Sequence, residues 1–226
     1  MRTQRISNYK YPPRKVSLVT WLCLSFVVFA FLERLFVDLA QAIVITCILI
    51  SICAFIYQIY QKSYIEHIFT AAHLQQNLRH GGWVIQWQNI AEVNVVTIEQ
   101  EGWHQELPWV GIRLKEYSPI LKGICPRIIS DILLQQRPLL ILGCRHHKKP
   151  FEDIVLDEKE YISPSGQVYT GLNAMLVNRM RHQRRFFGFD LYISESDIRM
   201  DKNEFIGIAR RYLAAKKENV ECPKKD

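Results

Sequence analysis

Two uncharged runs decide the fold of this chain: VSLVTWLCLSFVVFAFL at residues 16–32 and LAQAIVITCILISICAFIYQIY at residues 39–60. They contain 17 and 22 residues, without Gly or Pro, and are joined by ERLFVD at residues 33–38. At about 1.5 Å per residue, the shorter run covers roughly 25 Å, close to the thickness of a hydrocarbon core. An uninterrupted helix also satisfies its own backbone polar groups in lipid. Residues 16–60 are therefore predicted to form a transmembrane helical hairpin.

Two other readings of the runs are a helical hairpin buried in a soluble core and a cleaved signal peptide. Core helices of soluble proteins rarely remain uncharged over such lengths. No small-residue cleavage site follows Leu32, and a second apolar run begins at once. The transmembrane reading is therefore favoured.

The distribution of Lys and Arg predicts the orientation. The basic tail, residues 1–15, contains five Lys and Arg residues, whereas the loop contains only Arg34. Because cytoplasmic flanks carry the excess of Lys and Arg, the tail is predicted to be cytoplasmic. With two spans, residues 61–226 lie on the same side, which predicts a multi-pass protein of the cell inner membrane with both termini cytoplasmic.

The charge distribution argues against nucleic-acid binding, and the cysteine positions argue against a disulfide framework. The net charge of +7 divides into +5 in the tail, −1 in the loop and +3 in residues 61–226. Most of the excess is therefore a topology signal that also attracts anionic lipid, and we predict no nucleic-acid partner. Cys125, Cys144 and Cys222 are far apart in a reducing compartment, so free thiols are expected.

Residues 61–217 are predicted to form one cytoplasmic α+β domain that begins with an antiparallel sheet. A strand at Phe69–Asn77 leads through Gly81 and Gly82 into a strand at Trp83–Trp87. Strands follow at Glu92–Glu99, with a bulge near Val95, and at Leu107–Lys115. Alternation places Trp83 and Trp87 in the core and leaves Trp103 exposed in a turn.

A helical insertion is predicted at about residues 119–187. It contains helices at Pro126–Gln136 and Gly171–Phe187, separated by an exposed, self-neutralising loop that includes Arg145–Lys149 and Glu152–Glu160. A short strand at Phe189–Ile193 and a C-terminal helix at Asp201–Lys217 complete the domain. Residues 218–226 are predicted to be a disordered tail.

Four segments carry a family resemblance: RHGGWVIQWQNI at residues 79–90, LPWVGIRL at 107–114, YTGLNAML at 169–176 and RRYLAA at 210–215. They resemble an uncharacterised proteobacterial family of two-span inner-membrane proteins, a domain of unknown function. More distantly, the chain is similar to bacterial pleckstrin-homology-like (PH-like) proteins of the YcxB type. That similarity implies a curved antiparallel sheet capped by a C-terminal helix, and it supplies no catalytic residues.

No catalytic or cofactor signature is present, and neither a cofactor nor a metal is predicted. Cys144-Arg145-His146-His147 is the nearest approach to a metal cluster, but paired ligands are lacking. The basic face of the helix at 171–187, together with Trp103, is the candidate lipid- or partner-binding surface. Its arginines are Arg179, Arg181, Arg184 and Arg185. A solvated helix face with Arg stems covering the core is the alternative.

The predicted function is that of a non-enzymatic interaction or regulatory module at the inner membrane. Its expected partners are the lipid bilayer and either anionic lipid headgroups or a membrane-protein partner; the sequence does not set the oligomeric state. The alternative is a membrane-bound hydrolase or transferase whose site is scattered over the cytoplasmic domain.

Overall fold

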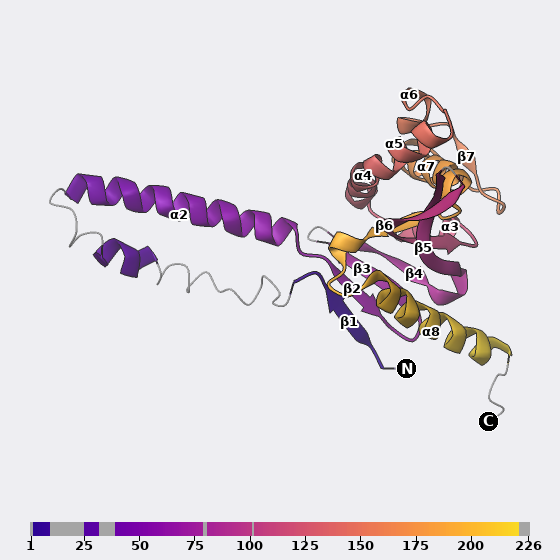
Figure 1. Cartoon of the computed structure of the whole chain (residues 1–226), viewed down its shortest axis with the longest axis horizontal. Helices are drawn as coiled ribbons and strands as arrows, with labels where there is room; N and C mark the ends of the chain where they lie inside the picture. Colours follow the sequence, from indigo (N-terminus) through magenta and orange to yellow (C-terminus); the bar gives the residue numbers. More distant parts are fainter. Residues whose placement is uncertain (1, 10–24, 32–38, 79–80, 101, 222–226) are drawn as a thin grey trace. The chain divides into compact units, whose positions relative to one another are not determined.

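The computed structural model describes residues 2–9, 25–31, 39–78, 81–100 and 102–221 (Figure 1). The chain divides into two compact units. One comprises Tyr9–Ile65, and the other combines Met1–Asn8 with Glu66–Asp226. The second unit is therefore assembled from both sides of the apolar stretch.

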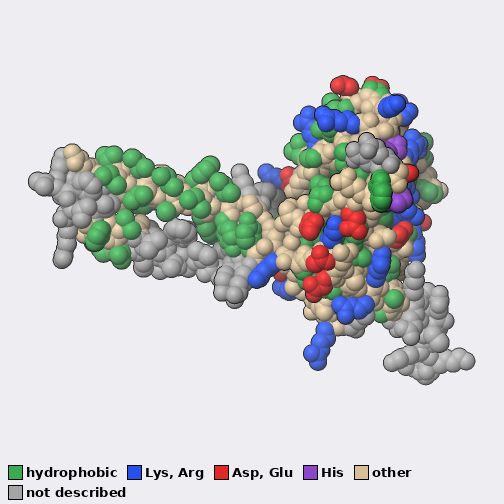
Figure 2. Space-filling model, viewed as in Figure 1, with side chains coloured by type: hydrophobic (Ala, Val, Ile, Leu, Met, Phe, Trp, Pro, Cys, Tyr) green, Lys and Arg blue, Asp and Glu red, His purple; other side chains and the backbone are tan. Residues whose placement is uncertain are grey.

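The apolar unit contains the long helix α2, Leu39–Lys62. Within it, Val44–Gln61 is the one helix of the described residues that is long and apolar enough to cross a membrane. Apolar side chains cover its surface (Figure 2). Residues 25–31 are also helical, but the other residues of the first predicted span lie outside the described ranges. One candidate span is thus observed, and the second span remains a prediction.

A four-stranded antiparallel sheet opens the domain: β1 (Gln4–Ser7), β2 (Glu66–Phe69), β3 (His73–Leu78) and β4 (Gly81–Gln86), in that order. Residues 1–15 were predicted to be a tail, but this prediction is wrong for β1. The strand buries Ile6 and pairs with β2. The predicted single strand at Phe69–Asn77 is wrong, because the chain turns within it. The Thr70 hydroxyl oxygen accepts a hydrogen bond from His73 N at 3.0 Å and closes that turn.

A three-stranded antiparallel sheet follows, formed by β5 (Ile90–Gln100), β6 (Trp103–Leu114) and β9 (Leu191–Ser194) in the order β5-β6-β9. The predicted bulge is confirmed, since the register shifts between Val95 and Thr97. The predicted core positions Trp83 and Trp87 are buried, and Trp103 is 80% exposed. A 3-10 turn, η2 (Trp87–Asn89), connects the two sheets.

The helical insertion lies between β6 and β9. Its elements are α3 (Ser118–Gly123), α4 (Pro126–Gln135), α5 (Arg137–His146), α6 (Glu152–Val155), the hairpin β7 (Tyr161–Ile162) and β8 (Val168–Tyr169), and α7 (Gly171–Phe187). Helix α7 has its predicted bounds and ends at Gly188, whose φ is +84°. The predicted exposed loop is partly wrong, because α5 includes Arg145 and α6 buries Ile154.

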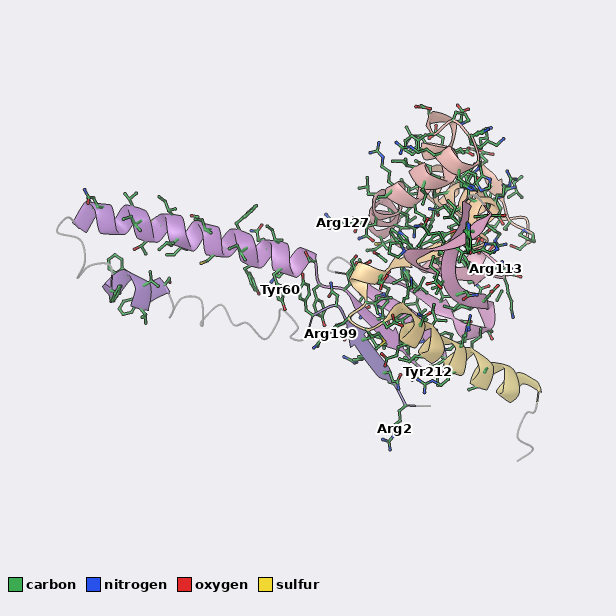
Figure 3. All side chains as sticks on the ribbon, viewed as in Figure 1. Arg2, Tyr60, Arg113, Arg127, Arg199 and Tyr212 are labelled. Carbon is green, nitrogen blue, oxygen red and sulfur yellow. The ribbon has the colours of Figure 1, made fainter. Side chains whose placement is uncertain are left out.

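The chain closes with η3 (Glu195–Asp197) and α8 (Lys202–Glu221), whose side chains contact β2, η2 and β5. Tyr212 stacks on Trp87 with ring centroids 5.6 Å apart, and its hydroxyl donates to the Arg2 carbonyl next to β1 (Figure 3). Because α8 runs past its predicted end at Lys217, residues 218–221 are helical instead of disordered. Residues 222–226 lie outside the described ranges.

The core contains a histidine, His67, on β2. Its side chain is fully buried, and neither ring nitrogen has a hydrogen-bond partner among the described residues. The ring lies edge-on to Phe205 of α8, with centroids 5.4 Å apart. Burial lowers the pKa of His67 from 6.5 to about 4, because the charged form is poorly solvated there. The imidazole is therefore neutral at pH 7.

This histidine predicts a stability that falls with acidification. Below pH 6.5 the unfolded chain takes up a proton that the folded chain accepts only near pH 4, so protonation favours unfolding. Between pH 7 and pH 4.5 the resulting loss is about 2–3 kcal/mol. Urea unfolding of the full chain in detergent measures it as the difference between wild type and His67→Phe. An equal loss in both proteins would contradict the assignment.

Candidate functional site

The four arginines predicted on α7 occupy two environments. Arg181 and Arg185 lie one turn apart and are exposed. Arg179 is buried and Arg184 is half-buried. The helix therefore presents two of the four side chains to solvent and uses the other two inside the domain.

Arg184 is held by a buried carboxylate, Asp190, which precedes β9. Asp190 is fully buried; its Oδ2 accepts from Leu114 N at 2.7 Å and its Oδ1 from the Tyr117 hydroxyl at 2.9 Å. Arg184 Nη2 also donates to Oδ2. Burial and the adjacent carboxylate raise the pKa of Tyr117, which keeps its hydroxyl protonated as a donor. This network fastens α7 to β6 and β9.

Arg179 lies two turns from the end of α7 and is only 2% exposed. Its Nη2 donates to the Val155 carbonyl, at the end of α6, at 2.9 Å. Its Nε and Nη1 have no hydrogen-bond partner among the described residues. Burial lowers the pKa of the guanidinium to about 10, so the group stays charged at pH 7. Gln183, one turn further on, is fully buried, and both of its amide atoms also lack a described partner.

A second surface forms where the tip of the β5–β6 hairpin meets the end of α5. Gly102 turns the hairpin with a φ of +81° and leaves Trp103 in solvent. His146 Nε2 donates to the Glu99 carbonyl, and Glu99 pairs with His104. We call this the tip surface; its exposed members are Glu99, Trp103, His104, Arg145, His146, Lys148 and Lys149.

Side-chain contacts extend from the tip surface to α7. His147 stacks on Phe186 with ring centroids 4.9 Å apart, and Phe186 is the neighbour of Arg185. The structure therefore places Trp103 and Arg185, two of the predicted binding residues, on elements linked through the end of α5. Figure 2 shows histidines with Lys and Arg beside them on one flank of the domain.

The residues of the sequence Cys144-Arg145-His146-His147 do not converge on a metal. Cys144 is buried among Leu140, Ile154 and their neighbours, while His146 turns to the β5–β6 hairpin. In the described ranges no three His, Cys, Asp or Glu side chains are grouped to hold a metal ion.

At the end of α5, a lysine adopts a backbone conformation that favours glycine. Lys148 has a φ of +51°, its N–H donates to Arg145 O at 3.3 Å, and Lys149 N–H donates to Cys144 O at 2.9 Å. These two bonds are those of a Schellman motif, in which the left-handed residue is usually Gly. A lysine there costs conformational energy and adds a positive charge to the tip surface.

Comparison with protein-family models matches residues 67–215 to a family described as protein of unknown function (DUF2982). The match covers more than half of the chain. No curated protein and no solved structure matches significantly.

Replacing Lys148 by Gly tests the left-handed position. We expect Lys148→Gly to stabilise the domain by about 0.5–1 kcal/mol, because Gly adopts positive φ without steric cost. Chemical denaturation of the full chain in detergent measures the change. Lys149→Gly is the matched control and is expected to be neutral or destabilising; equal gains in both variants would contradict the role of φ.

Proposed function

The chain belongs to this DUF2982 family, and we propose that it is a membrane-anchored, non-enzymatic interaction module. In this proposal a two-span hairpin in the inner membrane presents a PH-like domain to the cytoplasm. The observation that carries the proposal is the pairing of β1 with β2 on either side of the apolar stretch.

This pairing supports two spans in place of one. Ser7 and Glu66 are cross-strand partners, so their Cα atoms lie about 5 Å apart. Residues 8–65 therefore leave the domain and return to the same point. If α2 crosses a membrane, the chain must cross an even number of times, and the uncharged run at residues 16–32 supplies the second crossing. The Tyr9 and Tyr60 rings, 4.6 Å apart, support adjacent ends within the apolar unit.

The sheet arrangement supports the PH-like part of the proposal. A four-stranded and a three-stranded antiparallel sheet are followed by the terminal helix α8, which packs on the core. These are the parts that the YcxB-type resemblance implies, with the helical insertion placed between β6 and β9.

We further propose that the tip surface contacts anionic headgroups of the membrane that holds the chain. It combines an exposed tryptophan with Lys and Arg side chains, a combination suited to the membrane interface. Each basic side chain near an anionic surface contributes about 1 kcal/mol. Tethering keeps the headgroups at high effective concentration, so modest affinity is sufficient.

Cysteine labelling tests the topology. We expect an impermeant maleimide added to intact spheroplasts to modify a Leu35→Cys variant and to leave the domain residue Cys125 unmodified. Lysed cells, in which both thiols are reachable, provide the control. Modification of Cys125 from outside, or protection of the cysteine at position 35, would overturn the two-span hairpin.

Lipid contact is tested on the full chain in nanodiscs of neutral or anionic lipid. We expect peptides covering residues 99–106 and 144–150 to exchange amide hydrogens more slowly in anionic discs, with the protection lost at high salt. The double variant Trp103→Ala, Lys149→Ala is expected to lose this protection. The control is Arg211→Ala, which changes an exposed residue of α8 and is expected to keep it. Equal exchange in both discs would contradict lipid contact. Protection only by an added acidic peptide would point to a protein partner instead.

A further inference from the structure

The helical insertion contains a buried positive charge without a negative partner. Arg179 takes part in none of the ion pairs of the described residues. Asp157, two residues beyond the Val155 carbonyl that Arg179 binds, is itself bound by Asn178 and His182. The partly exposed Arg184, in contrast, is paired with Asp190. Among the described residues, a carboxylate thus pairs with the more exposed arginine and none pairs with the more buried one.

The surroundings of Arg179 do not compensate for its charge. Cys144 lies close enough to interact with it, but burial raises the pKa of this thiol, which is therefore neutral at pH 7. Arg137, also within electrostatic range, adds a second positive charge. A buried charge without a partner is strongly unfavourable. A negative group from outside the chain would remove this cost.

The guanidinium of Arg179 retains an edge that an oxyanion can use. Nη2 carries two N–H bonds, and the Val155 carbonyl uses one of them. The other N–H, together with Nε or Nη1, forms a pair of parallel donors. Such a pair matches two oxygens of a phosphate or carboxylate. Gln183, on the same face of α7 one turn away, adds an unpartnered amide.

We propose that Arg179 is the centre of a binding site for a small oxyanion, with inorganic phosphate or a carboxylate as its chemical class. The site lies where α7 meets the end of α6, and Arg137, exposed at the start of α5 and cation–π paired with Phe151, marks the solvent side. Gln183 supplies a further donor. The site is separate from the tip surface and does not depend on how the chain is anchored.

The test uses the full chain in nanodiscs of neutral lipid at pH 7. Sodium phosphate is titrated at constant ionic strength. A morpholinoethanesulfonate salt is chosen to keep the ionic strength constant, because its anion is too bulky for a buried site. We expect a saturable rise of the unfolding temperature, equivalent to about a 100-fold gain in the folded-to-unfolded ratio at 100 times the Kd. Calorimetry is expected to give one phosphate bound per chain.

Variants separate this site from general charge effects. Arg179→Met is expected to abolish the response, and Arg181→Met, an exposed arginine on the same helix, to retain it. If Arg179→Met does not fold, Arg137→Met is expected to weaken phosphate binding by about tenfold without disturbing the core. No phosphate response in wild type, or the same response in Arg179→Met, would overturn the proposal.

Discussion

The pairing of β1 with β2 is the constraint on which the rest of the structure depends. It joins residues that are about sixty positions apart in sequence, one strand on each side of the apolar stretch. It also inserts Ile6 into the core, while Tyr212 of α8 donates to the backbone beside β1. The two units are therefore not consecutive in the sequence, because the larger unit includes residues from both sides of the apolar stretch.

Local patterns in the sequence predicted most of the fold, and contacts between distant residues account for the errors. Helix α7 and the buried positions of β4 follow from periodicities of 3.6 and 2. Strand β1 could not be predicted in this way. Its four residues, QRIS, show no periodicity, and its partner strand lies beyond the apolar stretch. The turn that divides β2 from β3 depends on the Thr70 side chain, and no Gly or Pro marks it.

The candidate site could be predicted only by residue type. The arginines of α7 were identified, but their exposure depends on Asp190 and Val155, which are remote or unremarkable in sequence. The tip surface was missed because Arg145–Lys149 was read with the acidic residues that follow it as one self-neutralising loop. In the fold, α5 and its Schellman motif present the basic residues at its end, where His146 bonds to the β5–β6 hairpin.

The position of β1 also has a consequence for how the protein is made. Its partner β2 is synthesised only after the whole apolar stretch. The first sheet therefore cannot be completed until the whole apolar stretch has been synthesised. Until β1 and β2 pair, β2 keeps an unpaired edge that could pair with another chain.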